Sequence, residues 1–175
     1  MDDLIKALEL SVANKNWYGA LFVAMSVPDI CGYLEYPTEG SQARYERWFK
    51  KYMLPKYSRC IGGDSTPHIF MSPSDCYALR CALLHEGREE ITEQRARKAL
   101  DRFHFIEPPP NCLIHCNEIN NNVLQLQVNI FCNDVLSGLQ EWLRDIQNDS
   151  NVKQRIGKIL KVYPHNQIPG RHIGR

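Results

Sequence analysis

The segment SPSDCYALRCALLHEG, residues 72–87, decides the helical fold expected of this chain. Ser72 is expected to be the N-cap, Pro73 suits the first helical position, and Asp75 completes a capping box. Gly87 is well placed to end the helix, because glycine adopts the left-handed conformation of a C-cap without steric cost. The segment therefore predicts one well-capped helix.

Three further helices are expected before this segment. Residues 2–14 carry one stripe of apolar side chains, with acidic residues in the first turn. Asn16 can cap a second helix, which Pro28 is expected to kink or end. Aromatic residues at helical spacing predict a third helix over residues 42–54, and a loop is expected over residues 56–71. The aromatic positions are Tyr45, Trp48, Phe49 and Tyr52.

The second half of the chain contains the signals of a small sheet. Residues 112–119 and 123–130 alternate apolar and polar side chains. The run Asn120-Asn121-Asn122 between them is a turn signal. This pattern predicts an antiparallel β-hairpin, with a third strand near residues 103–106.

Helices are also expected around this hairpin. Thr92 is expected to cap a short helix that runs through Leu100. The last long helix is expected to begin at Asn133 or Asp134. A short basic helix can follow at residues 151–161.

The expected fold class is mainly α (α+β). It is a helical bundle of five or six helices with a small antiparallel β-hairpin inserted before the last long helix. Residues 1–162 are expected to form one domain, with the β insertion at about residues 103–130. Residues 163–175 form a basic tail that is expected to be flexible.

The composition favours a globular intracellular protein. The hydrophobic fraction of 43% is sufficient for a continuous core. No apolar run approaches the ~18 residues that cross a bilayer, so no membrane association is expected. An odd number of cysteines, seven, and no secretory leader indicate reduced thiols and a cytoplasmic location. The net charge is only +1, so basic residues can form local faces without making the whole chain a nucleic-acid binder.

Within the predicted helix, four residues separate Arg80 from His85. This spacing and its helical setting resemble the Arg-x4-His motif of the HEPN superfamily. The resemblance implies a helical domain of a kind that often dimerises. Many members are metal-independent ribonucleases that act as toxins or defence factors. Members usually carry Asn or Asp directly after the arginine, where this chain has Cys81, and Arg97 with His104 also matches the motif at its loosest spacing.

The resemblance implies cleavage of RNA without a metal or another cofactor. RNA carries its own nucleophile, the 2′-hydroxyl, so His85 is expected to act as general base or acid and Arg80 to bind the phosphate. Residues five apart on an α-helix are rotated by about 140°, so the site is expected to need a loosened last turn or a second subunit. Asp29, Tyr77 and Glu86 are expected to be supporting polar groups.

A structural interpretation of the same residues stays open. Arg80 can pair with Asp29 or Asp75 inside the bundle, and His85 can complement the negative end of its helix. The domain would then be a non-catalytic helical interaction module that binds a protein partner or RNA. The expected partners are therefore RNA, a second copy of the chain in a homodimer, and a protein such as an antitoxin.

The third predicted helix also carries basic residues, whose outward angles predict a face that contacts RNA phosphates. They are Arg44, Arg47 and Lys51. The aromatic residues of that helix are assigned to the core.

The cysteines suggest two further chemistries, and neither is favoured. Cys112, His115 and Cys116, with His104 and Cys132, invite a zinc hypothesis. Strand alternation would point His115 away from its neighbouring cysteines, and a second close pair of ligands is missing, so no metal site is predicted. Cys76 or Cys81 beside His85 could form a nucleophile pair, but a buried thiol is the favoured interpretation.

Overall fold

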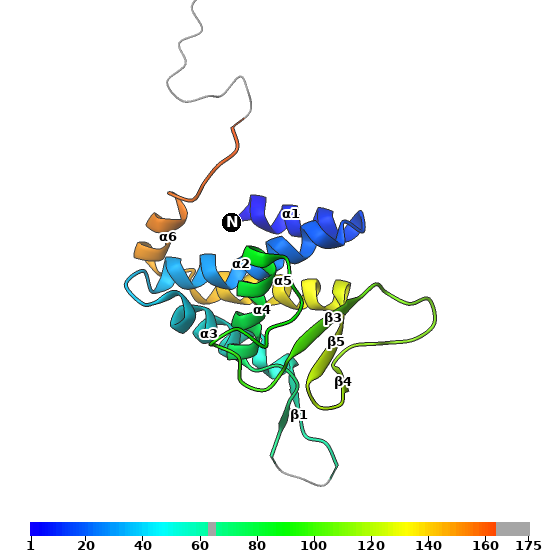
Figure 1. Ribbon diagram of the computed structural model, residues 1–175. Helices are drawn as coiled ribbons and strands as arrows, with labels where there is room; N and C mark the ends of the chain where they lie inside the picture. Colours follow the sequence, from blue (N-terminus) through cyan, green and yellow to red (C-terminus); the bar gives the residue numbers. More distant parts are fainter. Residues whose placement is uncertain (63–65, 164–175) are drawn as a thin grey trace, which may run out of the picture.

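The computed structural model describes residues 1–62 and 66–163 and consists mainly of α-helices (Figure 1). Its helices are α1 (Asp2–Ala13), α2 (Trp17–Glu35), α3 (Ser41–Tyr52), α4 (Pro73–Glu86), α5 (Val128–Asp145) and α6 (Ser150–Ile156). A single 3-10 turn, Leu54–Lys56, follows α3. The predicted class, a helical bundle with a small β insertion before the last long helix, is confirmed.

The central element of the bundle is α2, which packs against all five of the other helices. The four aromatic residues predicted to form the core face of α3 are all buried. Trp142 of α5 is fully buried, and its indole Nε1 donates a hydrogen bond of 2.9 Å to the Glu35 carboxylate of α2. The core therefore contains satisfied polar contacts between helices as well as apolar packing.

Helix α2 continues through Pro28 to Glu35, so of the two predicted outcomes, a kink or an end, the end does not occur. A proline inside a helix costs about 3 kcal/mol, because one backbone hydrogen bond is lost. Val27, Cys31 and Leu34 around it are buried, and each buried side chain of this kind contributes about 1.5–3 kcal/mol. Burial on α2 therefore outweighs the proline.

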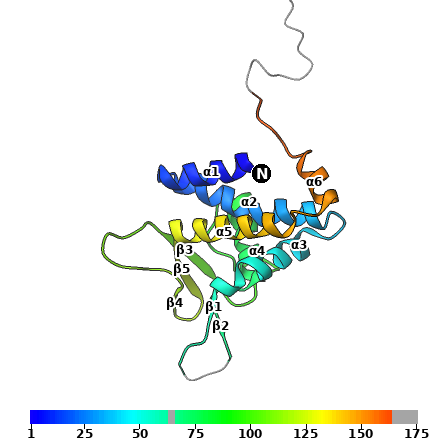
Figure 2. The same cartoon turned by 180° about the vertical axis from the view of Figure 1, so that it is seen from behind.

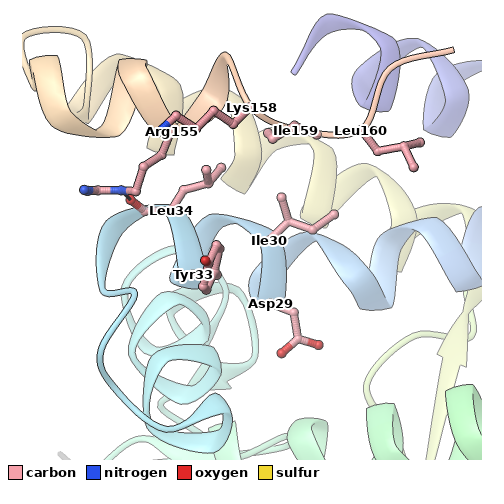
Figure 3. A pocket seen from close by; sticks show the side chains of 8 residues that line it. All are labelled: Asp29, Ile30, Tyr33, Leu34, Arg155, Lys158, Ile159 and Leu160. Carbon is pink, nitrogen blue, oxygen red and sulfur yellow. Dashed lines mark hydrogen bonds between the residues drawn. The ribbon is translucent and has the colours of Figure 1, made fainter.

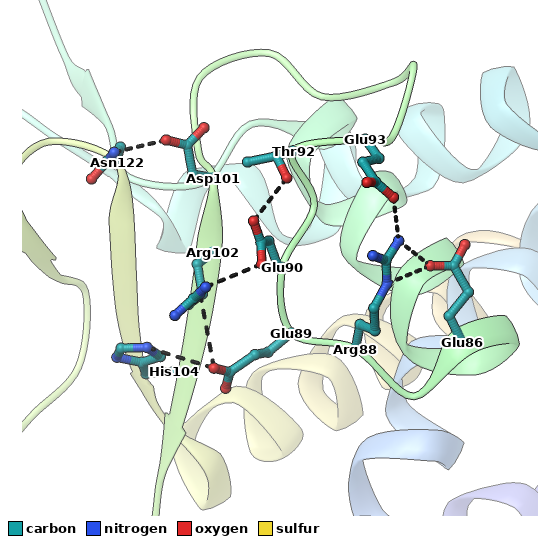
Figure 4. Close-up of polar contacts among 10 residues, drawn as sticks. All are labelled: Glu86, Arg88, Glu89, Glu90, Thr92, Glu93, Asp101, Arg102, His104 and Asn122. Atoms are coloured by element: carbon teal, nitrogen blue, oxygen red, sulfur yellow. Dashed lines mark hydrogen bonds and ion pairs between the residues drawn. The ribbon is translucent and has the colours of Figure 1, made fainter.

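The helix predicted from Thr92 through Leu100 is wrong, because these residues form turns. Thr92 Oγ1 donates to the Glu90 side chain and caps no helix (Figure 4). The buried carboxylate of Asp75 instead accepts three backbone N–H groups, those of residues 98, 99 and 100, at 2.7, 3.0 and 3.4 Å. A contact from α4, distant in sequence, therefore determines the path of this segment.

The predicted hairpin consists of β4 (Asn117–Ile119) and β5 (Val123–Gln127), which pair antiparallel. Its turn contains Asn120 and Asn121 at φ values of 51° and 63°, a conformation that asparagine tolerates well. The third strand, β3 (Arg102–Ile106), is confirmed and pairs parallel with β5, which gives the order β3-β5-β4.

Other boundaries differ from the sequence prediction. The predicted loop over residues 56–71 contains a short hairpin, β1 (Ser58–Arg59) and β2 (His68–Ile69). Helix α5 begins at Val128, several residues before the predicted start. Its buried residues recur on one helical face from Val128 onward, so the end of the predicted strand is the first helical turn. The predicted tail beyond Tyr163 lies outside the described residues.

Both views place the strands at one end of the bundle and α6 at the other (Figures 1 and 2). Helix α6 is shorter than predicted, and its N-cap is Asp149, whose carboxylate accepts the N–H groups of Asn151 and Val152.

We predict that Asp75→Ala lowers the free energy of unfolding by about 3 kcal/mol, because three backbone N–H groups lose a charged acceptor whose side chain is buried. Thr92→Ala is the matched control and should change stability by less than about 0.5 kcal/mol. Urea denaturation followed by circular dichroism measures both values. A larger loss for Thr92→Ala than for Asp75→Ala would contradict this description of residues 92–100.

Candidate functional site

The predicted helix of residues 72–87 is α4, and its ends are formed by the residues expected from the sequence. Ser72 Oγ accepts the backbone N–H of Asp75 at 3.1 Å. Gly87 closes the helix with φ 67°, in the left-handed region. The helix is regular over Pro73–Glu86, so it presents Arg80 and His85 on a rigid element.

The guanidinium group of Arg80 has two neighbours within hydrogen-bonding distance. Its Nε donates to Asp29 Oδ2 of α2 at 2.5 Å, and both side chains are largely buried. Its Nη1 lies 2.9 Å from Nε2 of His85, which is exposed. The structure therefore brings Arg80, Asp29 and His85 together within one chain.

This contact needs neither a loosened last turn nor a second subunit, which was the expectation from helical geometry. The Cα positions of Arg80 and His85 are still rotated by about 140° around α4. The long arginine side chain bridges this angle and reaches the imidazole. The Arg80–Asp29 pair predicted by the structural interpretation is present at the same time, so the two interpretations share one arrangement.

Arg80 and Asp29 form a partly buried ion pair. Burial raises the pKa of Asp29 above its ordinary value, and the neighbouring Arg80 opposes this rise. Burial acts to lower the pKa of Arg80, but Asp29 and the adjacent Cys81 raise it above its ordinary value, so Arg80 is a permanent cation. The fork of Arg80 is oriented by Asp29, which matches the arrangement needed to hold a phosphate.

The protonation of His85 follows from its neighbour. A guanidinium group can only donate hydrogen bonds, so Nε2 of His85 accepts and its ring proton lies on Nδ1. Nε2 therefore carries a lone pair next to the cation that would bind a phosphate. This is the arrangement of a base positioned beside an anion-binding group.

The two remaining supporting residues, Tyr77 and Glu86, make their hydrogen bonds and ion pairs with other partners. Tyr77 faces α3, where its hydroxyl is 3.0 Å from Ser41 Oγ, and burial raises the pKa of its phenol. Glu86 pairs with Arg88, which also pairs with Glu93 (Figure 4), and accepts a hydrogen bond from Gln94. Among the described residues, the polar contacts of Glu86 do not include Arg80 or His85.

The predicted basic face of α3 consists of Arg44, Arg47 and Lys51. Arg47 pairs with Glu39 at 2.7 Å and Lys51 with Asp145 at 2.7 Å. Arg44 donates to the backbone oxygen of Glu39 at 3.0 Å, and its guanidinium lies over the ring of Tyr33. Each basic group therefore already contacts an internal partner, and only Arg44 reaches toward the Asp29 side of α2.

The residues of the zinc hypothesis are dispersed. Residues 112–116 form no strand, so the alternation assumed for them is wrong. Cys112 is exposed and Cys116 buried. In the part of the chain that the structure describes, no three His, Cys, Asp or Glu side chains are grouped so as to hold a metal ion. The side chain of His115 is instead only 8% exposed, with its ring centroid 5.6 Å from that of Tyr57 and its Nε2 3.9 Å from the Asp134 carboxylate.

Sequence reasoning missed one feature of the site, a groove that opens beside Asp29. It lies between α2 and the stretch from Arg155 of α6 to Leu160, and its volume is about 700 Å³ (Figure 3). The run of basic residues after position 151 was the available signal. The partner segment on α2 could not be identified without the tertiary structure.

Comparisons with protein-family models, with curated proteins and with solved structures find no match to this chain. No helix among the described residues is long and apolar enough to cross a membrane.

We predict that His85 carries its proton on Nδ1 in the native protein. Nitrogen-15 NMR of the imidazole should show an unprotonated Nε2 at pH 8, and Arg80→Ala should shift this resonance because the donor is lost. A proton on Nε2 of the wild-type protein would contradict the Arg80–His85 contact.

We also predict a pH effect from His115. Burial lowers the pKa of His115 below its ordinary 6.5, so the native state binds its proton less readily than the unfolded state. The stabilisation is complete above pH 6.5 and is lost as pH falls below it. His115→Gln should therefore flatten the fall in stability between pH 7 and pH 5 seen by urea denaturation. Between pH 7.5 and 8.5 the difference between the two proteins should be constant, and parallel curves at low pH would refute this account.

Proposed function

We propose that this chain is a metal-independent endoribonuclease of HEPN type, in which Arg80 binds the scissile phosphate and His85 is the general base. The observation that carries the proposal is the 2.9 Å contact between Arg80 Nη1 and His85 Nε2, with Arg80 anchored on Asp29. A fixed cation beside an unprotonated imidazole nitrogen is the pair that cleavage by the 2′-hydroxyl requires.

In the proposed reaction, a phosphate oxygen takes the place of His85 on the Arg80 guanidinium and so releases the lone pair of Nε2. His85 then removes the proton of the 2′-hydroxyl, and the 2′-oxygen attacks the adjacent phosphorus. A new bond forms between phosphorus and the 2′-oxygen while the bond to the 5′-oxygen breaks. The leaving 5′-oxygen takes a proton from water or from the imidazolium. The products are a 2′,3′-cyclic phosphate and a 5′-hydroxyl.

Arg80 supplies the electrostatic part of this mechanism. Asp29 binds Nε, and Nη1 lies beside the exposed His85, where the guanidinium can stabilise charge on the phosphate oxygens. Tyr77 supports the position of α4 against α3 through its contact with Ser41. No step requires a metal ion or another cofactor.

One observation favours a second candidate, a non-catalytic interaction module. Cys81 occupies the position where HEPN proteins usually carry Asn or Asp, and its sulfur lies 4.0 Å from Arg80 Nη1. A thiol is a weaker hydrogen-bond group than an amide or carboxylate. Arg80 would then be a structural ion-pair partner of Asp29, and the domain would bind a protein partner or RNA.

The proposal also includes the partners and location implied by the resemblance. A homodimer, or a complex with a protein antitoxin, would cover the exposed His85 without being needed to bring it to Arg80. All seven cysteines are free thiols, in line with a cytoplasmic location.

We predict that the purified protein cleaves end-labelled single-stranded RNA or tRNA in excess EDTA and leaves 2′,3′-cyclic phosphate ends. His85→Ala should lower the cleavage rate about 10²–10⁴-fold through loss of the base. Arg80→Ala should lower it about 10²–10³-fold through loss of charge stabilisation. Arg80→Lys retains a cation for Asp29 and separates loss of activity from loss of folding.

Arg97→Ala and His104→Ala are the matched controls, because this pair has the looser spacing and lies outside the site. Both should retain wild-type activity. Absence of cleavage by the folded wild type would move the assignment to the interaction module. Cleavage that survives both His85→Ala and Arg80→Ala would place the activity elsewhere.

A further inference from the structure

The groove beside Asp29 has features of a ligand site that the proposed catalytic pair does not use. Figure 3 shows α2 on one side and the segment after α6 on the other. Its volume of about 700 Å³ falls within the range of small-molecule sites. The lining residues are Asp29, Ile30, Tyr33, Leu34, Arg155, Lys158, Ile159 and Leu160.

The aromatic residue of the groove is Tyr33, whose side chain is 52% exposed. The guanidinium of Arg44 lies 5.3 Å from the centre of its ring. A cation against the ring holds the phenol in place, and the exposed remainder of the ring borders the groove. A fixed and exposed aromatic ring with apolar neighbours is a stacking platform for a flat, unpaired base.

The charges of the groove favour an anionic ligand. Arg155 and Lys158 supply two positive charges, and Arg155 is held by a hydrogen bond of 2.5 Å from its Nε to the backbone oxygen of Leu34. Asp29 is the single acidic residue among the lining residues, and Arg80 neutralises it. The groove is therefore positive in sum and apolar at Ile30 and Ile159.

Asp29 is shared by the groove and the catalytic pair. Asp29 lines the groove and bonds Arg80, and Arg80 in turn contacts His85. A phosphate on Arg80 and a nucleotide in the groove would therefore both lie beside Asp29.

We propose that this groove binds the nucleotide adjacent to the scissile phosphate of single-stranded RNA. The base stacks on Tyr33 between Ile30 and Ile159, and Lys158 and Arg155 contact the next phosphate. The inference rests on the proposed ribonuclease function and adds to it a substrate class, unpaired RNA, because a base inside a duplex cannot reach a stacking platform. Stacking accepts every base, so the site should have little sequence preference.

The test measures binding separately from cleavage. A fluorescent single-stranded RNA with 2′-O-methyl groups at every position cannot be cleaved, and its anisotropy reports affinity for the full chain. Tyr33→Ala should weaken binding about tenfold, whereas Tyr33→Phe, which retains the ring, should bind like the wild type. Lys158→Glu should weaken binding and reduce the slope of log affinity against log salt by about one or more.

Two variants are matched controls, one on α2 and one on α6, just before the segment that carries Lys158. Tyr18→Ala removes another exposed tyrosine of α2, 78% exposed, at the far end of that helix from Tyr33. Lys153→Glu makes the same charge change as Lys158→Glu, but at a residue of α6 that does not line the groove. Both should bind RNA as the wild type does.

Parallel cleavage assays separate this inference from the proposed function. Active wild-type enzyme with unchanged RNA affinity in Tyr33→Ala and Lys158→Glu would overturn the groove and leave the ribonuclease intact. Binding that depends on Tyr33 and Lys158, without any cleavage, would support the groove and contradict the ribonuclease. Equal loss in the control variants, or equal affinity for a duplex of the same RNA, would also overturn the groove.

Discussion

The ion pair between Asp29 and Arg80 is the interaction on which the site depends, because it joins α2 to α4 at a position with little access to water. Their side chains are only 15% and 20% exposed. Removing one partner would leave a poorly hydrated charge, which is costly even where the intact pair adds little net stability. The pair therefore determines the direction of the Arg80 guanidinium more than it stabilises the fold. Everything proposed for His85 and for the groove follows from that direction.

One stretch of α2 connects the pair with its surroundings. A Cβ on Gly32 would lie 2.9 Å from the backbone oxygen of Arg44, so the close approach of α2 and α3 requires glycine there. That approach brings Arg44 over Tyr33, which lies four residues after Asp29 and also lines the groove. Asp29, Gly32 and Tyr33 thus place an anchor, a helix contact and an aromatic surface on neighbouring turns of one helix.

Local signals were sufficient for the elements whose ends are formed by their own residues. Ser72 and Gly87 predicted α4 because caps act within one turn, and the aromatic spacing of α3 predicted its core face. The helix predicted after Thr92 was wrong because backbone N–H groups of that segment bond to Asp75, a partner distant in sequence. The start of α5 was predicted too late because the pattern of residues 128–130 fits both a strand and a helix.

The candidate site also has a part that could be predicted from local sequence and a part that depends on tertiary packing. The pair of Arg80 and His85 was found from their spacing, and Asp29 was among the predicted neighbours. Their direct contact was not expected, since helical angles describe Cα positions and take no account of the reach of an arginine side chain. The groove could not be predicted, because Tyr33 and Lys158 line one groove only through the packing of α6 against α2.

The most direct measurement is a crystal structure of the chain bound to a short RNA with methylated 2′-oxygens. The account predicts a phosphate on the Nη groups of Arg80, with Asp29 still on Nε and a 2′-oxygen beside His85 Nε2. RNA bound elsewhere, with the Arg80–His85 contact unbroken, would contradict it.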